Sequence, residues 1–277
     1  MPQVVAWLSF YSYRFDSVII ECSKKMRKKN STFDYNEIPL GFYDEIAQKQ
    51  KGMRSFWHNK KFKRVIDCFE GSQDSILDIG CFSGTFLSMI SQKKIPQQVG
   101  IDILKEQIDF ANKNYGADYR KFYLIDNFKQ VNAIPDEHFD LITIIEVVEH
   151  LNFIEIEDLI KLAYKKLKTG GKLIVTTPNY VSIWPLQELL LNIISDVKYE
   201  EQHITHFNYF SIKNKLNKIV DHMDTMFRLD YKTTTHFITP YIAIFSYRFA
   251  EKISIAVPPR KWTFPLGSLL LVELTKI

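Results

Sequence analysis

The segment from Ser75 to Gly84, SILDIGCFSG, constrains the fold of this chain more than any other stretch. Its apolar run ends near Asp78, and Gly80 and Gly84 follow, four residues apart, before an apolar segment of helical character. Glycines at such positions allow a tight turn between a buried strand and a helix. In an open parallel sheet this edge binds ligands through backbone N–H groups and side chains just beyond the strand. The sequence therefore predicts a ligand-binding strand, glycine loop and helix.

The glycine spacing separates two classes of cofactor. Dinucleotide-binding proteins need G-x-G-x-x-G to approach a pyrophosphate, which disfavours a dehydrogenase here. The segment resembles motif I of the class I S-adenosylmethionine (SAM) methyltransferases, D-x-G-x-G-x-G. SAM carries a sulfonium and an ammonium group but no phosphate, so a carboxylate beside the loop suits it. Phe82 stands where the family has its middle glycine, and we expect an ordinary backbone angle there.

Composition sets the class of protein. With 277 residues, 46% hydrophobic and 25% charged, the chain is long enough for one large α/β domain with appendages. A net charge of +4 gives no strong nucleic-acid signal. Cys22, Cys68 and Cys81 are too few and too widely spaced for a disulfide framework or a zinc motif, so we expect a cytoplasmic protein.

The amino-terminal segment Val4–Ile20 is aromatic-rich and precedes a basic cluster, Lys24–Lys29. Arg14 and Asp16 interrupt the apolar run, which argues against a transmembrane helix, and a secretory signal would carry its positive charges first. Two interpretations stay open: a packing helix, or a segment lying on an anionic membrane surface. Peripheral membrane association is thus left open.

Apolar residues at helical spacing predict a helix within Gly41–Phe69, ahead of the first strand. In methyltransferases of this type, helices before the sheet lie over the cofactor cleft. Tyr43, Trp57 and His58 then either line the substrate entrance or belong to the core of a capping helix.

Beyond motif I the chain alternates strands and helices, as a doubly wound fold does. Strands are predicted over Gln97–Asp102 and Tyr119–Ile125, with a helix over Leu104–Asn114 between them. Asp102 stands near the position where such folds place a carboxylate that accepts the ribose hydroxyls. Asp126-Asn127 follow the third strand, where the family often contacts the adenine amino group; the pair is also ordinary turn chemistry.

The passage IPDEHFDLITIIEVVEHL places charge at the end of a buried strand. Phe139–Ile145 reads as a central strand, and Glu146, Glu149 and His150 follow it. If the chain turns helical at Glu146, these three side chains share one side. Core packing does not explain them, because unpaired ions are costly to bury.

This passage resembles the E-x-x-E-H pattern of O-methyltransferases of the ubiquinone-pathway type, and KLKTGGKLIVTTPN (Lys166–Asn179) continues the match. The likeness covers about residues 75–180 and implies SAM as the cofactor. It assigns cofactor binding to Asp78, Gly80, Cys81, Gly84, Asp102, Ile103, Asp126, Asn127 and Glu146.

A histidine-bearing segment, Tyr199–Ser211, follows the apolar, helix-like Ser182–Ile194. Plant small-RNA 2'-O-methyltransferases look similar here and hold a magnesium ion, in a set that matches Glu146, Glu149, His150 and His206. A metal would lower the pKa of an acceptor hydroxyl. We favour instead His150 as the catalytic base, with help from Glu149 or His206, and keep a divalent metal as the less favoured alternative.

In the last third of the chain, the sequence predicts a helix over Ile212–Met223 and an antiparallel hairpin of Phe227–Thr234 and Ser268–Ile277. Between the hairpin strands, an apolar helical insertion of about residues 235–262 either walls the acceptor site or touches lipid.

Taken together, the sequence predicts an α/β, doubly wound, Rossmann-like fold with a seven-stranded, mostly parallel sheet. An N-terminal helical extension, residues 1–70, would cover the cofactor cleft of a methyltransferase domain, residues 71–277. The expected reaction moves the SAM methyl group to a hydroxyl of a small-molecule, glycan or lipid-linked acceptor. The alternatives are a metal-assisted RNA 2'-O-methyltransferase and a non-catalytic SAM-fold subunit.

Overall fold

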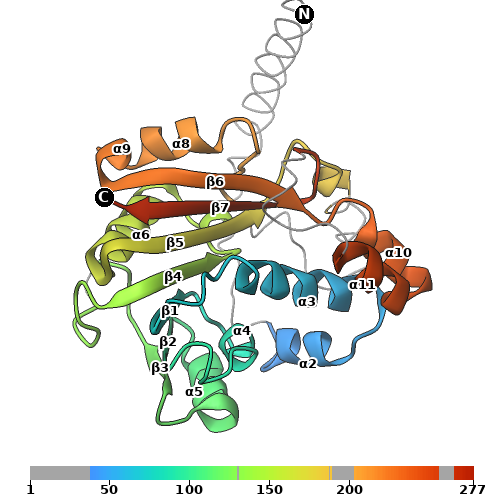
Figure 1. Ribbon diagram of the computed structural model, residues 1–277, viewed down its shortest axis with the longest axis horizontal. Helices are drawn as coiled ribbons and strands as arrows, with labels where there is room; N and C mark the ends of the chain where they lie inside the picture. The colour runs from blue at the N-terminus through green and yellow to red at the C-terminus, as the bar shows by residue number, and fades with distance from the viewer. Residues whose placement is uncertain (1–37, 130, 187, 189–202, 256–264) are drawn as a thin grey trace, which may run out of the picture. The chain divides into compact units, whose positions relative to one another are not determined.

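The computed structural model describes residues 38–277, apart from 130, 187, 189–202 and 256–264 (Figure 1). The predicted segments Val4–Ile20 and Lys24–Lys29 lie outside the described residues, as do most of Ser182–Ile194 and the end of the predicted insertion. Residues Tyr35–Ile277 form one compact unit. Among the described residues, no helix is both long enough and apolar enough to span a bilayer.

One seven-stranded sheet organises this unit, in the order β3-β2-β1-β4-β5-β7-β6 (Figure 1). The pairs among the first five strands are parallel, whereas β7 runs antiparallel to both of its neighbours. The predicted doubly wound sheet and closing hairpin are confirmed. The strands are β1 (Ser75–Ile79), β2 (Gln97–Asp102), β3 (Arg120–Leu124), β4 (Phe139–Ile145), β5 (Leu167–Pro178), β6 (Phe227–Thr235) and β7 (Leu269–Lys276).

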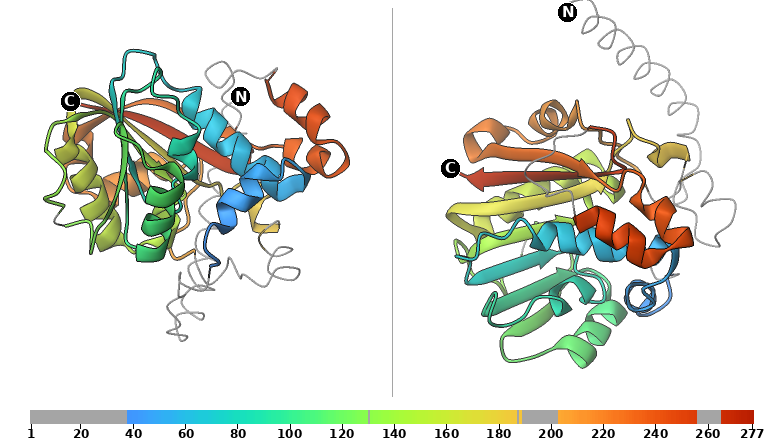
Figure 2. Two further views of the ribbon diagram at one scale, coloured as in Figure 1. Left: turned by 90° about the horizontal axis from the view of Figure 1, so that it is seen from below. Right: turned by 45° about the vertical axis from the view of Figure 1, so that its right-hand side comes forward.

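Helices cover both faces of the sheet (Figure 2). One face packs against α6 and α8 through apolar residues such as Leu159 and Leu216, and the other against α3, α4 and α5 through Phe62, Phe86 and Ile108. The described helices are α2 (Phe42–Gln48), α3 (Gly52–Ile66), α4 (Thr85–Ser88), α5 (Lys105–Tyr115), η2 (Val148–His150), α6 (Phe153–Lys166), α8 (Ile212–Ile219), α9 (Met223–Met226), α10 (Thr239–Phe245) and α11 (Tyr247–Ile255).

The helical segment ahead of the sheet consists of two helices, α2 and α3. Gln50, between them, has a left-handed φ of 44°, which ends the first helix. α3 also packs against the insertion between β6 and β7, where Phe56 contacts Ala243 of α10 and Ala250 of α11. The insertion thus lies beside α3, at the end of the sheet where β5 ends (Figures 1 and 2).

The strand order reverses between β1 and β4, since the chain runs outward from β1 to β3 and then crosses to β4. In a doubly wound sheet, the crevice at such a switch point is where ligands bind. The fold therefore places the ends of β1, β2 and β4 around one site.

Candidate active site

A cavity of about 270 Å³ lies at this switch point, between the strand ends and helix α3. It is lined by most of the residues predicted from sequence, from three separate strand ends. These are Asp78, Gly80, Cys81, Asp102, Ile103, Glu146, Glu149 and His150.

The glycine loop is shaped by close neighbours. Gly80 has φ 79°, and a Cβ there would lie 2.4 Å from Cγ2 of Val147. Gly84 has φ 77°, and its Cβ would lie 2.8 Å from the Phe122 ring. Both positions need glycine, because the backbone conformation is left-handed and the space is already filled.

The expectation for Phe82 is wrong. Its φ is 48°, in the left-handed region, so the loop keeps the conformation that the family's middle glycine would favour. The Phe82 N–H donates to Asp102 Oδ2 at 2.8 Å, and the ring packs edge-on against Tyr43 with centroids 5.2 Å apart. These contacts hold the strained residue, and its ring lines the cavity.

Asp102 and Asp78 bring two buried carboxyl groups to the loop. Asp102 accepts from the backbone N–H groups of Phe82 and, at 3.0 Å, Leu104. Asp78 accepts from Thr143 Oγ1 at 2.6 Å. Burial raises the pKa of both carboxyls, that of Asp78 to about 7, and the charge of Asp102 adds to the effect on Asp78.

The turn after β4 differs from the predicted helix. Glu146 has φ 53°, and a 3-10 turn over Val148–His150 follows it. The next helix, α6, begins only at Phe153, where Asn152 and Glu155 form a reciprocal capping box. Glu146, Glu149 and His150 still line one cavity, but a left-handed residue and a tight turn bring them there.

Glu146 is engaged with helix α3. Its carboxylate pairs with Lys61 and accepts from Trp57 Nε1 at 3.4 Å. The Lys61 Nζ also lies 3.3 Å from His58 Nδ1. Burial, then the charge of Lys61, holds the pKa of His58 well below its ordinary value. The predicted entrance residues Trp57 and His58 therefore line the cavity, as does Tyr43.

Glu149 is almost completely buried, with 1% of its surface exposed. Its Oε2 accepts from Thr177 Oγ1 at 3.0 Å, whereas Oε1 has no hydrogen-bond partner among the described residues. Burial, then the charge of Glu146, raises the pKa of Glu149 to about 8. A buried carboxyl oxygen without a partner points to a proton, a cation or a substrate group as its counterpart.

The histidine that joins this turn is His203. Glu149, His150 and His203 each offer a ligand atom within 4.8 Å of the others, and the two imidazole centroids are 5.0 Å apart. His203 Nδ1 lies 2.6 Å from Glu188 Oε1 and 2.8 Å from the Tyr180 hydroxyl. Burial lowers the pKa of His203, but the Glu188 hydrogen bond and nearby carboxylates more than offset it, leaving the pKa above its ordinary value.

His206, the histidine expected from sequence, does not line this cavity. It is exposed and stacks on Tyr180, with ring centroids 4.0 Å apart. The reason is local: residues 203–207 alternate between buried and exposed, as an extended segment does, so the side chain three positions after His203 points outward. The backbone of this segment is tied to the turn, because Ile204 and Thr205 N–H groups donate to the Glu149 carbonyl.

The predicted metal set is thus only half assembled. Glu146 is paired with Lys61 and His206 faces away, whereas Glu149, His150 and His203 come together. One carboxylate and two imidazoles suit a divalent cation, and the Glu188 contact on His203 is the kind of second partner that orients a metal-binding histidine. The three residues present therefore fit a cation.

The residues after β3 lie apart from the cavity. Asp126 and Asn127 are exposed and do not line it, and Asn127 Oδ1 accepts from the Lys129 N–H at 2.9 Å. Phe128 lines it instead. An apolar ring at this position offers a surface for a flat heterocycle.

Sequence reasoning missed Lys61 and His203. Lys61 is one of several basic residues in α3, of which Lys60 and Arg64 are buried too, and nothing in its spacing marks it as the one that pairs with Glu146. His203 stands three residues before His206, and only the alternation of the extended segment separates them. A period-two reading of HITHF would have raised His203 as an alternative.

Comparison with known proteins agrees with this geometry. A family model described as a methyltransferase domain matches residues 43–219, well over half of the chain. A malonyl-[acyl-carrier protein] O-methyltransferase of Ilyobacter polytropus is 25% identical over 64% of this chain and 63% of its own length. The mitochondrial ubiquinone biosynthesis O-methyltransferase of Rattus norvegicus is 34% identical over 38% of this chain and 30% of its own length. The chain thus spans less than two thirds of the length of either relative.

Solved structures share the fold. A SAM-dependent methyltransferase of Thermotoga maritima superposes with a TM-score of 0.58 at 17% identity, covering 85% of this chain and 94% of the other. The geranyl diphosphate C-methyltransferase of Streptomyces coelicolor gives 0.55 at 13% identity, over 89% and 86%. The family match starts at residue 43, inside the predicted extension 1–70, so that domain boundary stays a prediction. The strand-end carboxylates, the glycine loop and the family match together show that the chain belongs to the class I SAM-dependent methyltransferases.

Proposed function

We propose that this chain transfers the methyl group of SAM to a hydroxyl of a small-molecule acceptor, with the cluster of Glu149, His150 and His203 facing the acceptor. The observation that carries the proposal is the Glu149 oxygen with no hydrogen-bond partner from the described residues, next to two imidazoles in the same cavity as the glycine loop. Relatives named as O-methyltransferases support a hydroxyl as the acceptor group. The acceptor itself is a small molecule, a glycan or a lipid-linked precursor.

In this proposal, SAM lies across the glycine loop. Asp102 accepts from its ribose, and Asp78 and Glu146 place carboxylates near its cationic groups. Lys61 and Arg54 of α3, which also line the cavity, supply positive charge for the SAM carboxylate. Phe128 offers its ring to the adenine, and Asp126 and Asn127, which do not line the cavity, would reach the adenine only from its rim.

The reaction is an in-line displacement at an activated carbon, so the protein mainly aligns the two reactants and excludes water. The hydroxyl proton still needs an acceptor. A carboxyl with a pKa of about 8 next to His150 is matched to proton transfer near neutral pH. His206 would act only from outside the cavity, on Tyr180.

A divalent cation held by Glu149, His150 and His203 would lower the pKa of the acceptor hydroxyl. Because the cation would take the place of a proton on Glu149, its binding would release that proton.

The test measures methyl transfer from labelled SAM to fractions of a cell extract, and then to the hydroxyl compounds that take the label. Glu149→Gln should lower kcat by about 10²- to 10⁴-fold while the Kd for SAM stays within about twofold of wild type, since Gln keeps the shape of the side chain. Glu157→Gln makes the same substitution on the outer side of α6 and serves as the control. Label on nitrogen, or an unchanged kcat in Glu149→Gln, would contradict the proposal, and absence of SAM binding would favour a non-catalytic subunit.

The cation is tested separately. Manganese should raise the melting temperature of the wild type and not of His203→Ala, and a chelator should lower activity. If the chelator leaves activity unchanged, Glu149 and His150 act as the base without a cation.

A further inference from the structure

The helical insertion between β6 and β7 exposes an apolar surface that the proposed reaction does not use. Phe245, at the corner between α10 and α11, is 91% exposed, and Ile244 and Phe249 beside it are 57% and 56% exposed. Side chains of this size are seldom so exposed in clusters on a soluble domain, and such a cluster marks an interaction site.

An apolar groove continues this surface. It has a volume of about 530 Å³ and runs between the start of the insertion and the segment after β5. Its lining is apolar apart from Ser182 and the Tyr241 hydroxyl, and consists of Val181, Ser182, Ile183, Phe237, Ile238, Tyr241, Ile242, Phe245 and Leu266.

The charges around the corner are positive. Arg248 and Lys252 are exposed on α11 and neighbour each other at i, i+4 spacing, and Lys252 also neighbours Phe249 at i, i+3 spacing. The acid nearest in sequence, Glu251, is turned toward α3, where it pairs with Lys63 at 2.5 Å. Between Phe237 and Ala250 the sequence contains no acid. Apolar tips flanked by basic residues match an anionic lipid surface, where rings enter the acyl boundary and basic groups meet phosphates.

We propose that the corner between α10 and α11, with the adjoining groove, docks on the surface of an anionic lipid bilayer. This inference does not depend on the methyl acceptor. The segment 180–184 separates the groove from the reaction cavity: Trp184 lines the cavity, whereas Val181 and Ile183 line the groove. Docking would therefore bring the bilayer to the other side of the cavity wall, a position suited to a membrane-borne acceptor.

The test measures partition of the full chain onto vesicles of phosphatidylcholine with and without phosphatidylglycerol, by co-sedimentation over a lipid titration. Phe245→Ser should lower the partition coefficient about tenfold and Phe245→Ser/Phe249→Ser about a hundredfold, because each ring loses its burial in lipid. Arg248→Glu/Lys252→Glu should lower binding to anionic vesicles about tenfold or more and abolish the preference for them.

The matched control is a pair of isoleucines. Ile244→Ser should weaken binding severalfold, whereas Ile154→Ser, at a 67% exposed position in α6, should not. The segment Val4–Ile20 is present in every variant, so any contribution it makes to vesicle binding cancels in the ratio of variant to wild-type partition coefficients. Folding is monitored by melting temperature and by SAM affinity, neither of which should change.

Three results would overturn the proposal. One is a partition coefficient for Phe245→Ser/Phe249→Ser equal to that of wild type. Another is an equal loss in Ile154→Ser. The third is no vesicle binding by wild type, together with a dimer in solution that these substitutions dissociate, which would assign the surface to a second copy of the chain.

Discussion

The sheet has two edges formed by strand ends, one where the parallel strands begin and one where they end. Carboxylates at these two edges differ in their partners and in the direction of their pKa shifts. At the edge where the parallel strands begin, Asp140 accepts from Ser75 and pairs with Lys168 at 2.6 Å. Burial opposes ionisation of Asp140, but these hydrogen bonds outweigh it, so its pKa lies below the ordinary value. At the edge where the strands end, burial dominates, and the pKa of Asp78 rises to about 7 and that of Glu149 to about 8.

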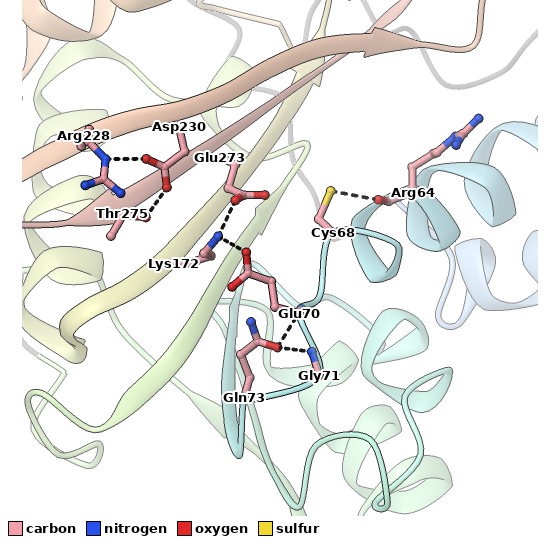
Figure 3. Close-up of polar contacts among 10 residues, drawn as sticks. All are labelled: Arg64, Cys68, Glu70, Gly71, Gln73, Lys172, Arg228, Asp230, Glu273 and Thr275. Carbon is pink, nitrogen blue, oxygen red and sulfur yellow. Dashed lines mark hydrogen bonds and ion pairs between the residues drawn. The ribbon is translucent and has the colours of Figure 1, made fainter. Parts of the chain in front are cut away.

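Figure 3 shows other charged residues at the first edge, ahead of β1 and on β5, β6 and β7. Lys172 bridges Glu70 at 2.5 Å and Glu273 at 2.7 Å, and Asp230 joins Arg228 and Thr275. Each of these charges has an opposite charge or a donor beside it. The cavity edge instead keeps a Glu149 oxygen that has no hydrogen-bond partner in the part of the chain that the structure describes.

The difference shows where this fold favours stability and where it favours ligand chemistry. Groups with perturbed pKa values and incomplete hydrogen bonding gather at functional sites, where a ligand completes them. Removing a charge at the edge where the strands begin should therefore lower stability, whereas removing one at the edge where they end should weaken SAM binding.

The largest effect is expected from breaking the network of Figure 3. Lys172→Met should lower the free energy of unfolding by about 3–5 kcal/mol, because Glu273, which is 1% exposed, loses its ion pair with Lys172 inside the protein. Urea denaturation measures this change. The SAM affinity of the folded protein should stay at the wild-type value, and Lys172→Arg should recover much of the stability. A large loss of SAM affinity at equal folding would show that the two edges are coupled.

The next largest effect concerns Asp102. Asp102→Asn removes the charge that accepts from Phe82 and Leu104 and would accept from the ribose, so the Kd for SAM should rise about 100-fold. Calorimetric titration measures it. Asp140→Asn is the control at the opposite edge and should leave the Kd unchanged while lowering stability. Equal Kd values for the two variants would contradict the assignment of Asp102.

The pH dependence of stability should have opposite signs at the two edges. The pKa of Glu149 is about 8 in the folded protein and 4.5 ordinarily. The contribution of Glu149 to the free energy of unfolding is therefore fully present below pH 4.5 and is lost as the pH rises to about 8. Relative to Glu149→Gln, cation-free wild type should lose about 1.4 kcal/mol per pH unit within this window.

The same measurement on Asp140→Asn provides the contrast. The folded pKa of Asp140 is below its ordinary value of 3.8, so its contribution is present above that pH and is lost as the pH falls. Urea denaturation of wild type and both variants from acid to mildly alkaline pH checks the two slopes. Slopes of the same sign would refute the contrast between the edges.

The smallest effect separates backbone strain from crowding. Gly80→Ala and Gly170→Ala place alanine at φ values of 79° and 78°. The new Cβ at Gly80 would lie 2.4 Å from Val147, whereas the one at Gly170 would meet no atom of the described residues within 4 Å. An alanine in the left-handed conformation should lower the free energy of unfolding of each variant by about 1 kcal/mol, and crowding should lower it by about 1 kcal/mol more in Gly80→Ala. Melting curves and SAM titration should show reduced affinity for Gly80→Ala alone. Equal losses would mean that Val147 yields to the new methyl group.

Much of the fold could be predicted because it depends on local pattern. The apolar run of Phe139–Ile145 is a strand with the predicted bounds, and Gln97–Asp102 is another. Predicted element boundaries were wrong where a single residue decides them. The helix expected from Glu146 does not start there, because Glu146 is left-handed and the capping box at Asn152 starts α6 later. At the strand ends, topology brings Asp78, Asp102 and Glu149 to one cavity, and the roles assigned to them stay predictions.

The sequence by itself determined the alternation of strands and helices, the glycine loop and the acids that follow the strands, because periodicity and turn chemistry act over a few neighbouring residues. Only the tertiary structure decided that His203 rather than His206 reaches Glu149, that Lys61 takes Glu146, and that Phe82 adopts a left-handed conformation. These outcomes depend on contacts between residues far apart in the chain. Their energies are set by burial and by the partner that each group meets, neither of which a local pattern contains.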